Sequence, residues 1–181
     1  MRISKAELHR KWLVATLLAA AVFGVLAGLD LRLKLVTGAG TADLQSFTAA
    51  IQYQGALFAW REGGAMARAG FNLGLDYLLM PLYAAALFYS GVIVMDAAQG
   101  RLRRLLSLAA LAPVVAAGLD GLENALQLHM LWNGPSDGLA GIAHTVSSAK
   151  WAGLIVGLGL LVGAVLTRVA ERKKRLLAQD D

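Results

Sequence analysis

Four long runs of apolar residues divide the chain, and the segments between them carry most of its Lys and Arg. The runs cover residues 12–29, 73–95, 105–131 and 139–167. A helix needs roughly 20 residues to cross the hydrocarbon core of a bilayer, and each run is close to or above that length. The pattern predicts an all-α protein, an integral membrane four-helix bundle that forms a single domain over residues 1–181.

The segment between the first two runs, residues 30–72, is too long for a simple turn and has a helical pattern of its own. Apolar residues recur near helical spacing at Leu44, Phe47, Ile51 and Phe58. We expect an extra amphipathic helix over about 43–60, lying at the membrane interface in the first periplasmic loop, with Tyr53 and Trp60 at the headgroup level. An ordinary loop helix is favoured over a lid on a ligand site.

The distribution of basic residues predicts the orientation. Twelve Lys and Arg flank the runs on the side of both termini, against four in residues 30–72. Because basic residues are retained on the cytoplasmic side, we expect a multi-pass protein of the bacterial inner membrane with both termini in the cytoplasm. A cleaved signal peptide is the alternative for residues 12–29, although that run is longer than the usual apolar region of such peptides.

Composition excludes several classes of protein. Hydrophobic residues make up 57% of the chain and charged residues 16%, which argues against a soluble or disordered chain. The absence of Cys removes thiolate nucleophiles and cysteine zinc sites. Neither HxxxH nor HExxH occurs, so we expect no metal and no cofactor. The net charge of +5 follows from the topology, and the basic tail at residues 172–175 suits membrane lipids rather than nucleic acid.

Ionisable residues inside the later runs are the main functional clue. Asp120, Glu123, Asn124 and Gln127 occupy one stripe of a helix, and Lys150 lies in the fourth run. Counted from the cytoplasmic ends of the runs, Asp30, Asp76, Glu123 and Lys150 all fall about 26–28 Å above that boundary. We therefore expect one polar layer in the outer half of the bilayer, with its members facing inward because an intramembrane charge is costly.

Three functions fit this layer. The first is an ionisable pocket that binds a lipid-like or amphipathic small molecule, lined by Asp76, Tyr77, Tyr83, Asp120, Glu123, Asn124, His144 and Lys150. The second is an internal ion-pair network in a structural or accessory subunit, with Lys150 paired to Glu123 or Asp120. The third is acid/base chemistry on a lipid or isoprenoid, for which Asp120, Glu123 and Lys150 are the candidate catalytic residues. Whether the protein is an enzyme stays open.

Small residues at GxxxG spacing suit close helix packing. They occur at Gly24/Gly28, Gly153/Gly157 and Gly159/Gly163. Packing within the chain is the default interpretation, and a homodimer through one of these faces is the alternative.

Three fragments carry a resemblance to known sequences. They are Asp76-Tyr77 with Pro81 and Tyr83, then Leu119-Asp120-Gly121-Leu122-Glu123-Asn124, then Lys150-Trp151. Together they resemble an uncharacterised family of small bacterial proteins with four transmembrane helices, over about the last 110 residues of the chain. The Asp-x-x-Glu-Asn piece is the most specific. The resemblance implies a membrane bundle and assigns no reaction to it.

Overall fold

The computed structural model describes residues 4–177 and contains only helices within that range. They are α1 (Lys5–Thr37), the 3-10 helix η1 (Ala42–Ser46), α2 (Ala50–Glu62), α3 (Met66–Asp96), α4 (Gly100–Ala109), α5 (Ala112–Asn133) and α6 (Asp137–Leu177). Four stretches are long and apolar enough to cross a membrane, namely α1, α3, α4 with α5, and α6. The prediction of an all-α bundle with four such helices is confirmed. Arg2 and the side chains of residues 174–177, part of the predicted basic flanks, lie outside the described residues.

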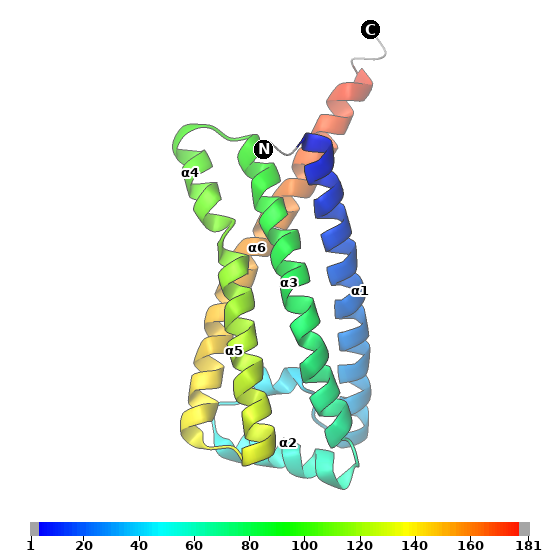
Figure 1. Cartoon of the computed structure of the whole chain (residues 1–181), viewed down its shortest axis with the longest axis vertical. Helices are drawn as coiled ribbons and strands as arrows, with labels where there is room; N and C mark the ends of the chain where they lie inside the picture. The colour runs from blue at the N-terminus through cyan, green and yellow to red at the C-terminus, as the bar shows by residue number, and fades with distance from the viewer. Residues whose placement is uncertain (1–3, 178–181) are drawn as a thin grey trace.

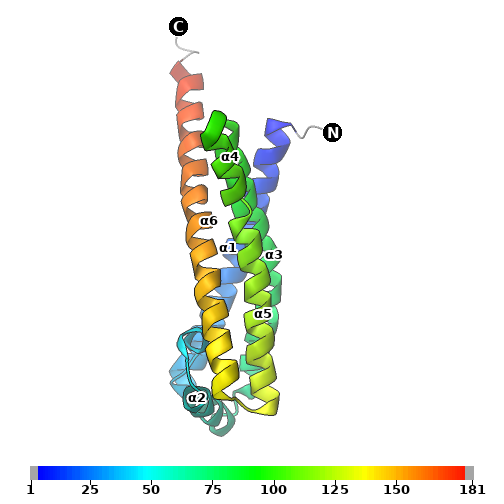
Figure 2. The same cartoon turned by 90° about the vertical axis from the view of Figure 1, so that its left-hand side faces the viewer.

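The bundle has two distinct ends. The start of α1 and the last turns of α6 lie at one end, here called the termini end (Figure 1). The other end is crossed by α2, which Figure 2 shows end-on beneath the long helices. We call η1 and α2 together the cap, and their end of the bundle the cap end.

Helix α1 packs on α3 through a narrow stripe. Its buried residues are Trp12, Ala15, Ala19, Leu26 and Leu33, at spacings of three, four and seven. Such spacing keeps one seam of a helix against a single neighbour. The rest of α1 exposes large apolar side chains, including Leu17 and Phe23, as expected for a helix surrounded by lipid.

Glycines let α3, α5 and α6 approach closely. A Cβ on Gly91 would lie 2.5 Å from the Cβ of Ala110, and one on Gly157 would lie 2.7 Å from Leu87. Of the predicted small-residue pairs, Gly153/Gly157 therefore packs within the chain. Gly24, Gly28 and Gly159 have no neighbour within 4 Å of a built Cβ, so the expected packing role does not hold for them.

The third predicted span is divided in two. Helix α4 ends at Ala109 and α5 begins at Ala112, with Pro113 in the first turn of α5. Because proline has no N–H, the carbonyl of Ala109 loses its helical donor, and the chain restarts its hydrogen bonding from Leu111. Pro81, by contrast, lies within the continuous helix α3.

The cap also differs from the predicted single helix over 43–60. The side-chain oxygen of Gln52 accepts hydrogen bonds from the N–H groups of Thr48 (2.7 Å) and Ala49 (3.1 Å). These bonds fix the N-terminus of α2, which begins at Ala50. The chain before it forms the separate helix η1.

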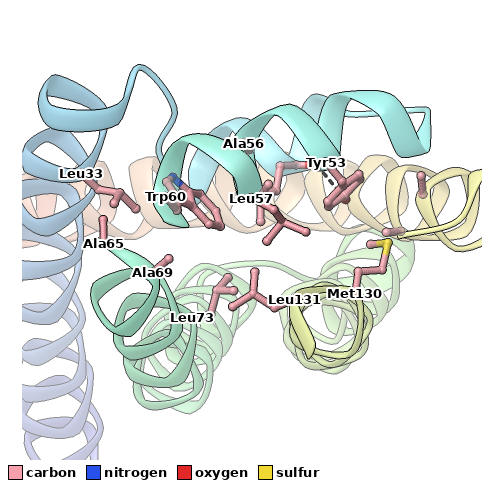
Figure 3. Packing of buried hydrophobic residues seen from close by; sticks show 13 residues of the cluster. Leu33, Tyr53, Ala56, Leu57, Trp60, Ala65, Ala69, Leu73, Met130 and Leu131 are labelled. Atoms are coloured by element: carbon pink, nitrogen blue, oxygen red, sulfur yellow. Dashed lines mark hydrogen bonds between the residues drawn. The ribbon is translucent and has the colours of Figure 1, made fainter. Parts of the chain in front are cut away.

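The buried face of α2 carries Tyr53 and Trp60. Tyr53, Ala56, Leu57 and Trp60 pack against Leu33, Leu73 and Met130, as Figure 3 shows. Tyr53 donates to the carbonyl of Leu44 (3.1 Å) and Trp60 to that of Ala39 (2.8 Å), which removes the cost of burying their polar atoms. Ile51 and Phe58 are exposed instead. The expected placement of Tyr53 and Trp60 among lipid headgroups is thus corrected, because both are enclosed by the protein.

Gly91→Ala is expected to destabilise the bundle by about 1–3 kcal/mol, because the new methyl group meets the backbone and side chain of Ala110. Gly159→Ala is the matched control, since its methyl group meets nothing and alanine favours helix. Thermal unfolding of both variants in one detergent would test this. Equal melting temperatures would contradict the close α3–α4 approach.

Candidate functional site

A buried ammonium group lies between two carboxylates at the centre of the site. Lys150 Nζ on α6 is 2.6 Å from Glu123 Oε2 and 2.9 Å from Asp120 Oδ1, both on α5. Relative exposures are 2% for Lys150, 0% for Glu123 and 5% for Asp120. Asp120 and Glu123 are three positions apart, so one face of α5 presents both carboxylates to α6. The predicted pairing of Lys150 with Glu123 or Asp120 is confirmed, and it involves both acids at once.

Neutral donors complete the coordination of these carboxylates. The hydroxyl of Tyr83 on α3 donates to Asp120 Oδ2 over 3.0 Å. The amide of Gln127 donates to Glu123 Oε1 over 2.8 Å. Gln127 itself is 1% exposed. Each carboxylate thus has one oxygen on the ammonium and the other on an uncharged donor, which offsets the cost of burying it.

A third carboxylate, Asp76 on α3, is held against α5 by the amide of Asn124, the residue after Glu123. Asn124 Nδ2 donates to Asp76 Oδ2 over 2.9 Å and lies 3.3 Å from the carbonyl of Leu73. Asp76 is only partly buried, and among the described residues no donor reaches its Oδ1. We define the ion-pair network as Asp76, Tyr83, Asp120, Glu123, Asn124, Gln127 and Lys150. It joins α3, α5 and α6.

Three residues of the predicted layer lie elsewhere. Asp30 accepts hydrogen bonds from the Thr41 hydroxyl (2.8 Å) and the Ala42 N–H (3.1 Å), and so holds the turn that follows α1. His144 Nδ1 is 3.3 Å from the carbonyl of Gln45 in η1. Tyr77 points to the outside of the α3–α5 seam, where its hydroxyl donates to the carbonyl of Gly121. A single pocket lined by all eight predicted residues is therefore not what the chain forms.

The expectation of one common depth holds for Asp76, Glu123 and Lys150, which the contacts of Lys150 and Asn124 bring to one level, and fails for Asp30. Trp12 Nε1 donates to Ser90 Oγ, so the start of α1 lies opposite Ser90 rather than the end of α3. At the cap end, Asn72 donates to Thr41, which is bound to Asp30. Asp30 is therefore level with Asn72, which precedes Asp76 by four residues, about 6 Å along α3. The ends of the apolar runs do not align.

Two polar atoms beside the network are buried, and sequence reasoning missed the one on Asn72. Asn72 Oδ1 and Ser147 Oγ are buried without a hydrogen-bond partner among residues 4–177. Asn72 lies one turn before Asp76 on α3, and Ser147 lies one turn before Lys150 on α6, so each shares the face of a network residue. Asn72 also lies outside the predicted second run, which began at residue 73.

The carboxylate of Glu123 acts electrostatically on a tyrosine of the cap. Burial raises the pKa of Tyr53 to about 12, and the carboxylate of Glu123 adds to that rise. The cap is further joined to α6 by Trp151, whose indole N–H donates to Gln45 Oε1 over 3.0 Å, and by Asp137, which accepts the Ala50 N–H over 2.8 Å.

The surface of residues 4–177 includes two hollows that no network residue lines. The larger, about 350 Å³, lies on the α3–α5 seam at the cap end and is lined by Met66, Ala67, Gly70, Leu131 and Trp132. The smaller, about 40 Å³, lies at the termini end and is lined by Lys5, Leu8, His9, Ile93, Asp96, Ala97 and Glu171. Among the residues described, no group of three or more His, Asp or Glu is arranged to hold a metal ion.

Comparison with protein-family models, with curated proteins and with solved structures found no match to this chain. The function is therefore argued from the geometry of the network, the cap and the hollows.

Lys150→Met is expected to destabilise the protein by about 3–5 kcal/mol, because it leaves two buried carboxylates without their cation. Adding Glu123→Gln should recover part of the loss, and the double-mutant cycle should show coupling. Lys11→Met is the control, since its ion pair with Glu7 is solvent-exposed. Absence of coupling at both Glu123 and Asp120, measured by unfolding in detergent, would contradict the ion pairs.

Proposed function

We propose that this chain is a multi-pass protein of the bacterial inner membrane with both termini in the cytoplasm. The support is the separation of charge along the bundle. Basic residues gather at the termini end, on the start of α1, on α4 and on the last turns of α6. The cap end has fewer of them over a longer segment, as the positive-inside rule requires of a periplasmic side.

A pair of reporter fusions tests this orientation. A fusion after Gln179 should read as cytoplasmic and one at Pro135, in the turn between α5 and α6, as periplasmic. The opposite readings would overturn the topology and the assignment of the cap to the periplasm.

The main role we propose for the network is structural, in a membrane subunit whose three core helices are held in one register. The observation that carries this is the burial of Lys150 together with both of its acids, each with a second partner. A ligand has no access to groups enclosed in this way. The same burial gives no support to acid/base catalysis by Asp120, Glu123 and Lys150, which would need a substrate in contact with them.

A homodimer would suit such a subunit, and the outer face of α1 supports one. Gly24 and Gly28 lie exposed with no neighbour within 4 Å, flanked by exposed leucines. Helices associate in lipid through faces of this kind. Crosslinking of a cysteine placed at Gly24 in native membranes would test it, and a monomer at every protein concentration would contradict it.

Binding of a lipid-like small molecule is the second candidate function, supported by the hollow on the α3–α5 seam. Ala67, Gly70, Gly74 and Tyr77 share one face of α3 at spacings of three and four. The small residues leave room beside Trp132, and the half-exposed Tyr77 offers a polar group farther along the seam. A molecule with an apolar body and a polar end fits such a surface better than it fits the closed network.

Gly70→Leu should abolish this binding by filling the hollow, since nothing lies within 4 Å of its Cβ position. The measurement is native mass spectrometry of protein extracted from its own membrane, scanning for a retained lipid or isoprenoid. Gly159→Leu, which adds the same side chain at an exposed position of α6, should keep the retained molecule. Equal retention by both variants, or none in the wild type, would contradict the seam site.

A further inference from the structure

The ion-pair network holds more acid than base. Asp76, Asp120 and Glu123 lie within electrostatic reach of one another, and Lys150 is the one cation that acts on all three. No basic residue of α1, α2 or α3 contributes a contact to them among residues 4–177. Three carboxylates against one ammonium leave two uncompensated negative charges in an apolar bundle, which is a costly arrangement.

The three acids are not equivalent. Asp120 and Glu123 each touch the ammonium group of Lys150, at 2.9 and 2.6 Å, and that contact favours their charged forms. Asp76 has no cation and receives one amide hydrogen bond, from Asn124 to its Oδ2. Its Oδ1 has no donor among the described residues. Of the three acids, Asp76 therefore has the contacts that stabilise its charged form least.

An independent observation points to a proton on that oxygen. Asn72 precedes Asp76 by four residues on α3, is 4% exposed, and uses its Nδ2 to donate to Thr41 over 2.6 Å. Its Oδ1 is a buried acceptor without a donor. Such an orphan acceptor is rare in folded proteins. A protonated Asp76, one turn away on the same helix face, would offer the missing donor.

We propose that Asp76 is a proton-binding site, which retains its proton at neutral pH and shares it with the amide oxygen of Asn72. Asn72 is in turn tied to the cap end of the bundle, because its amide donates to Thr41, whose hydroxyl donates to the partly exposed Asp30. The charged and titratable groups near Asp76 are Tyr77, Tyr83, Asp120, Glu123 and Lys150.

Infrared spectroscopy of the full chain in lipid nanodiscs tests the proton directly. The wild type should show the carbonyl stretch of a protonated carboxylic acid at pH 7, and labelling with ¹³C-aspartate should shift this band. Asp76→Asn should abolish the band, whereas Asp96→Asn, which changes an exposed acid at the termini end, should retain it. A missing band in the wild type, or one that survives in Asp76→Asn, would overturn the proposal. Loss of the band on adding Na⁺ at constant ionic strength would also overturn it, in favour of a metal cation.

The hydrogen bond to Asn72 is tested by the frequency of the same band. Asn72→Leu should keep the band but shift its frequency, because the acid loses its hydrogen-bond acceptor. An unchanged frequency would overturn the proposed contact. Circular dichroism and thermal unfolding confirm that each variant is folded before its spectrum is compared.

Stability gives a second measurement, with a definite sign. The folded protein holds a proton that the unfolded chain releases at neutral pH, so stability should fall as pH rises through the titration of Asp76. The melting temperature of Asp76→Asn should lack this fall. The ion pairs of Lys150 are unaffected by the outcome, so a failure here is distinguishable from a failure of the structural role proposed above.

Discussion

The structure depends on one ammonium group that has to be neutralised inside an apolar bundle. Lys150 reaches Glu123 and Asp120 only if α6 lies directly against α5. Gly153, one turn along α6, permits that approach, since a Cβ there would lie 2.9 Å from the carbonyl oxygen of Ala112. Asp120 also accepts the hydroxyl of Tyr83, and Asn124 of α5 donates to Asp76, so both contacts fix α3. A charge that is costly in lipid thereby specifies which helices touch and in what register.

The cap depends on a different principle, the burial of aromatic side chains whose polar atoms are satisfied. Trp60 is fully buried and Tyr53 nearly so, and each donates to a carbonyl of the preceding segment. Asp30 holds the turn from which this segment starts, and Gly40 is required there because a Cβ would lie 2.5 Å from the Asp30 carboxylate. Gln45 then joins η1 to His144 and Trp151 on α6. The cap thus connects α1 to α6 at the end where the network does not.

The apolar runs were sufficient to predict the four membrane-length helices, but not the break between α4 and α5 or the separate helix η1. The cost of lone charges was sufficient to predict the Lys150 pairing. The depth of Asp30 could not be derived in that way, because depth was counted from the ends of the apolar runs. Those ends do not align, as the Trp12–Ser90 hydrogen bond shows. The roles of Tyr77 and His144 were missed for a related reason. Residue type indicates that a side chain needs a polar partner, but only the rotation of the helix decides which neighbour supplies it.

The pairing of α5 with α6 also constrains how the chain enters the membrane. Inserting a lone helix with a lysine near its centre costs about 2.5–3.5 kcal/mol on insertion scales, and the acids of α5 add a similar cost to the insertion of that helix. Both costs fall if the two helices enter together, and residues 134–136 form the short turn of such a hairpin. Helix α1, whose buried stripe contains no charge, is free to insert alone beforehand. Helix α1 would then insert first and the α5–α6 hairpin last. Helix α3 would insert between them, and Tyr83 and Asp76 would form their hydrogen bonds only after the hairpin has entered.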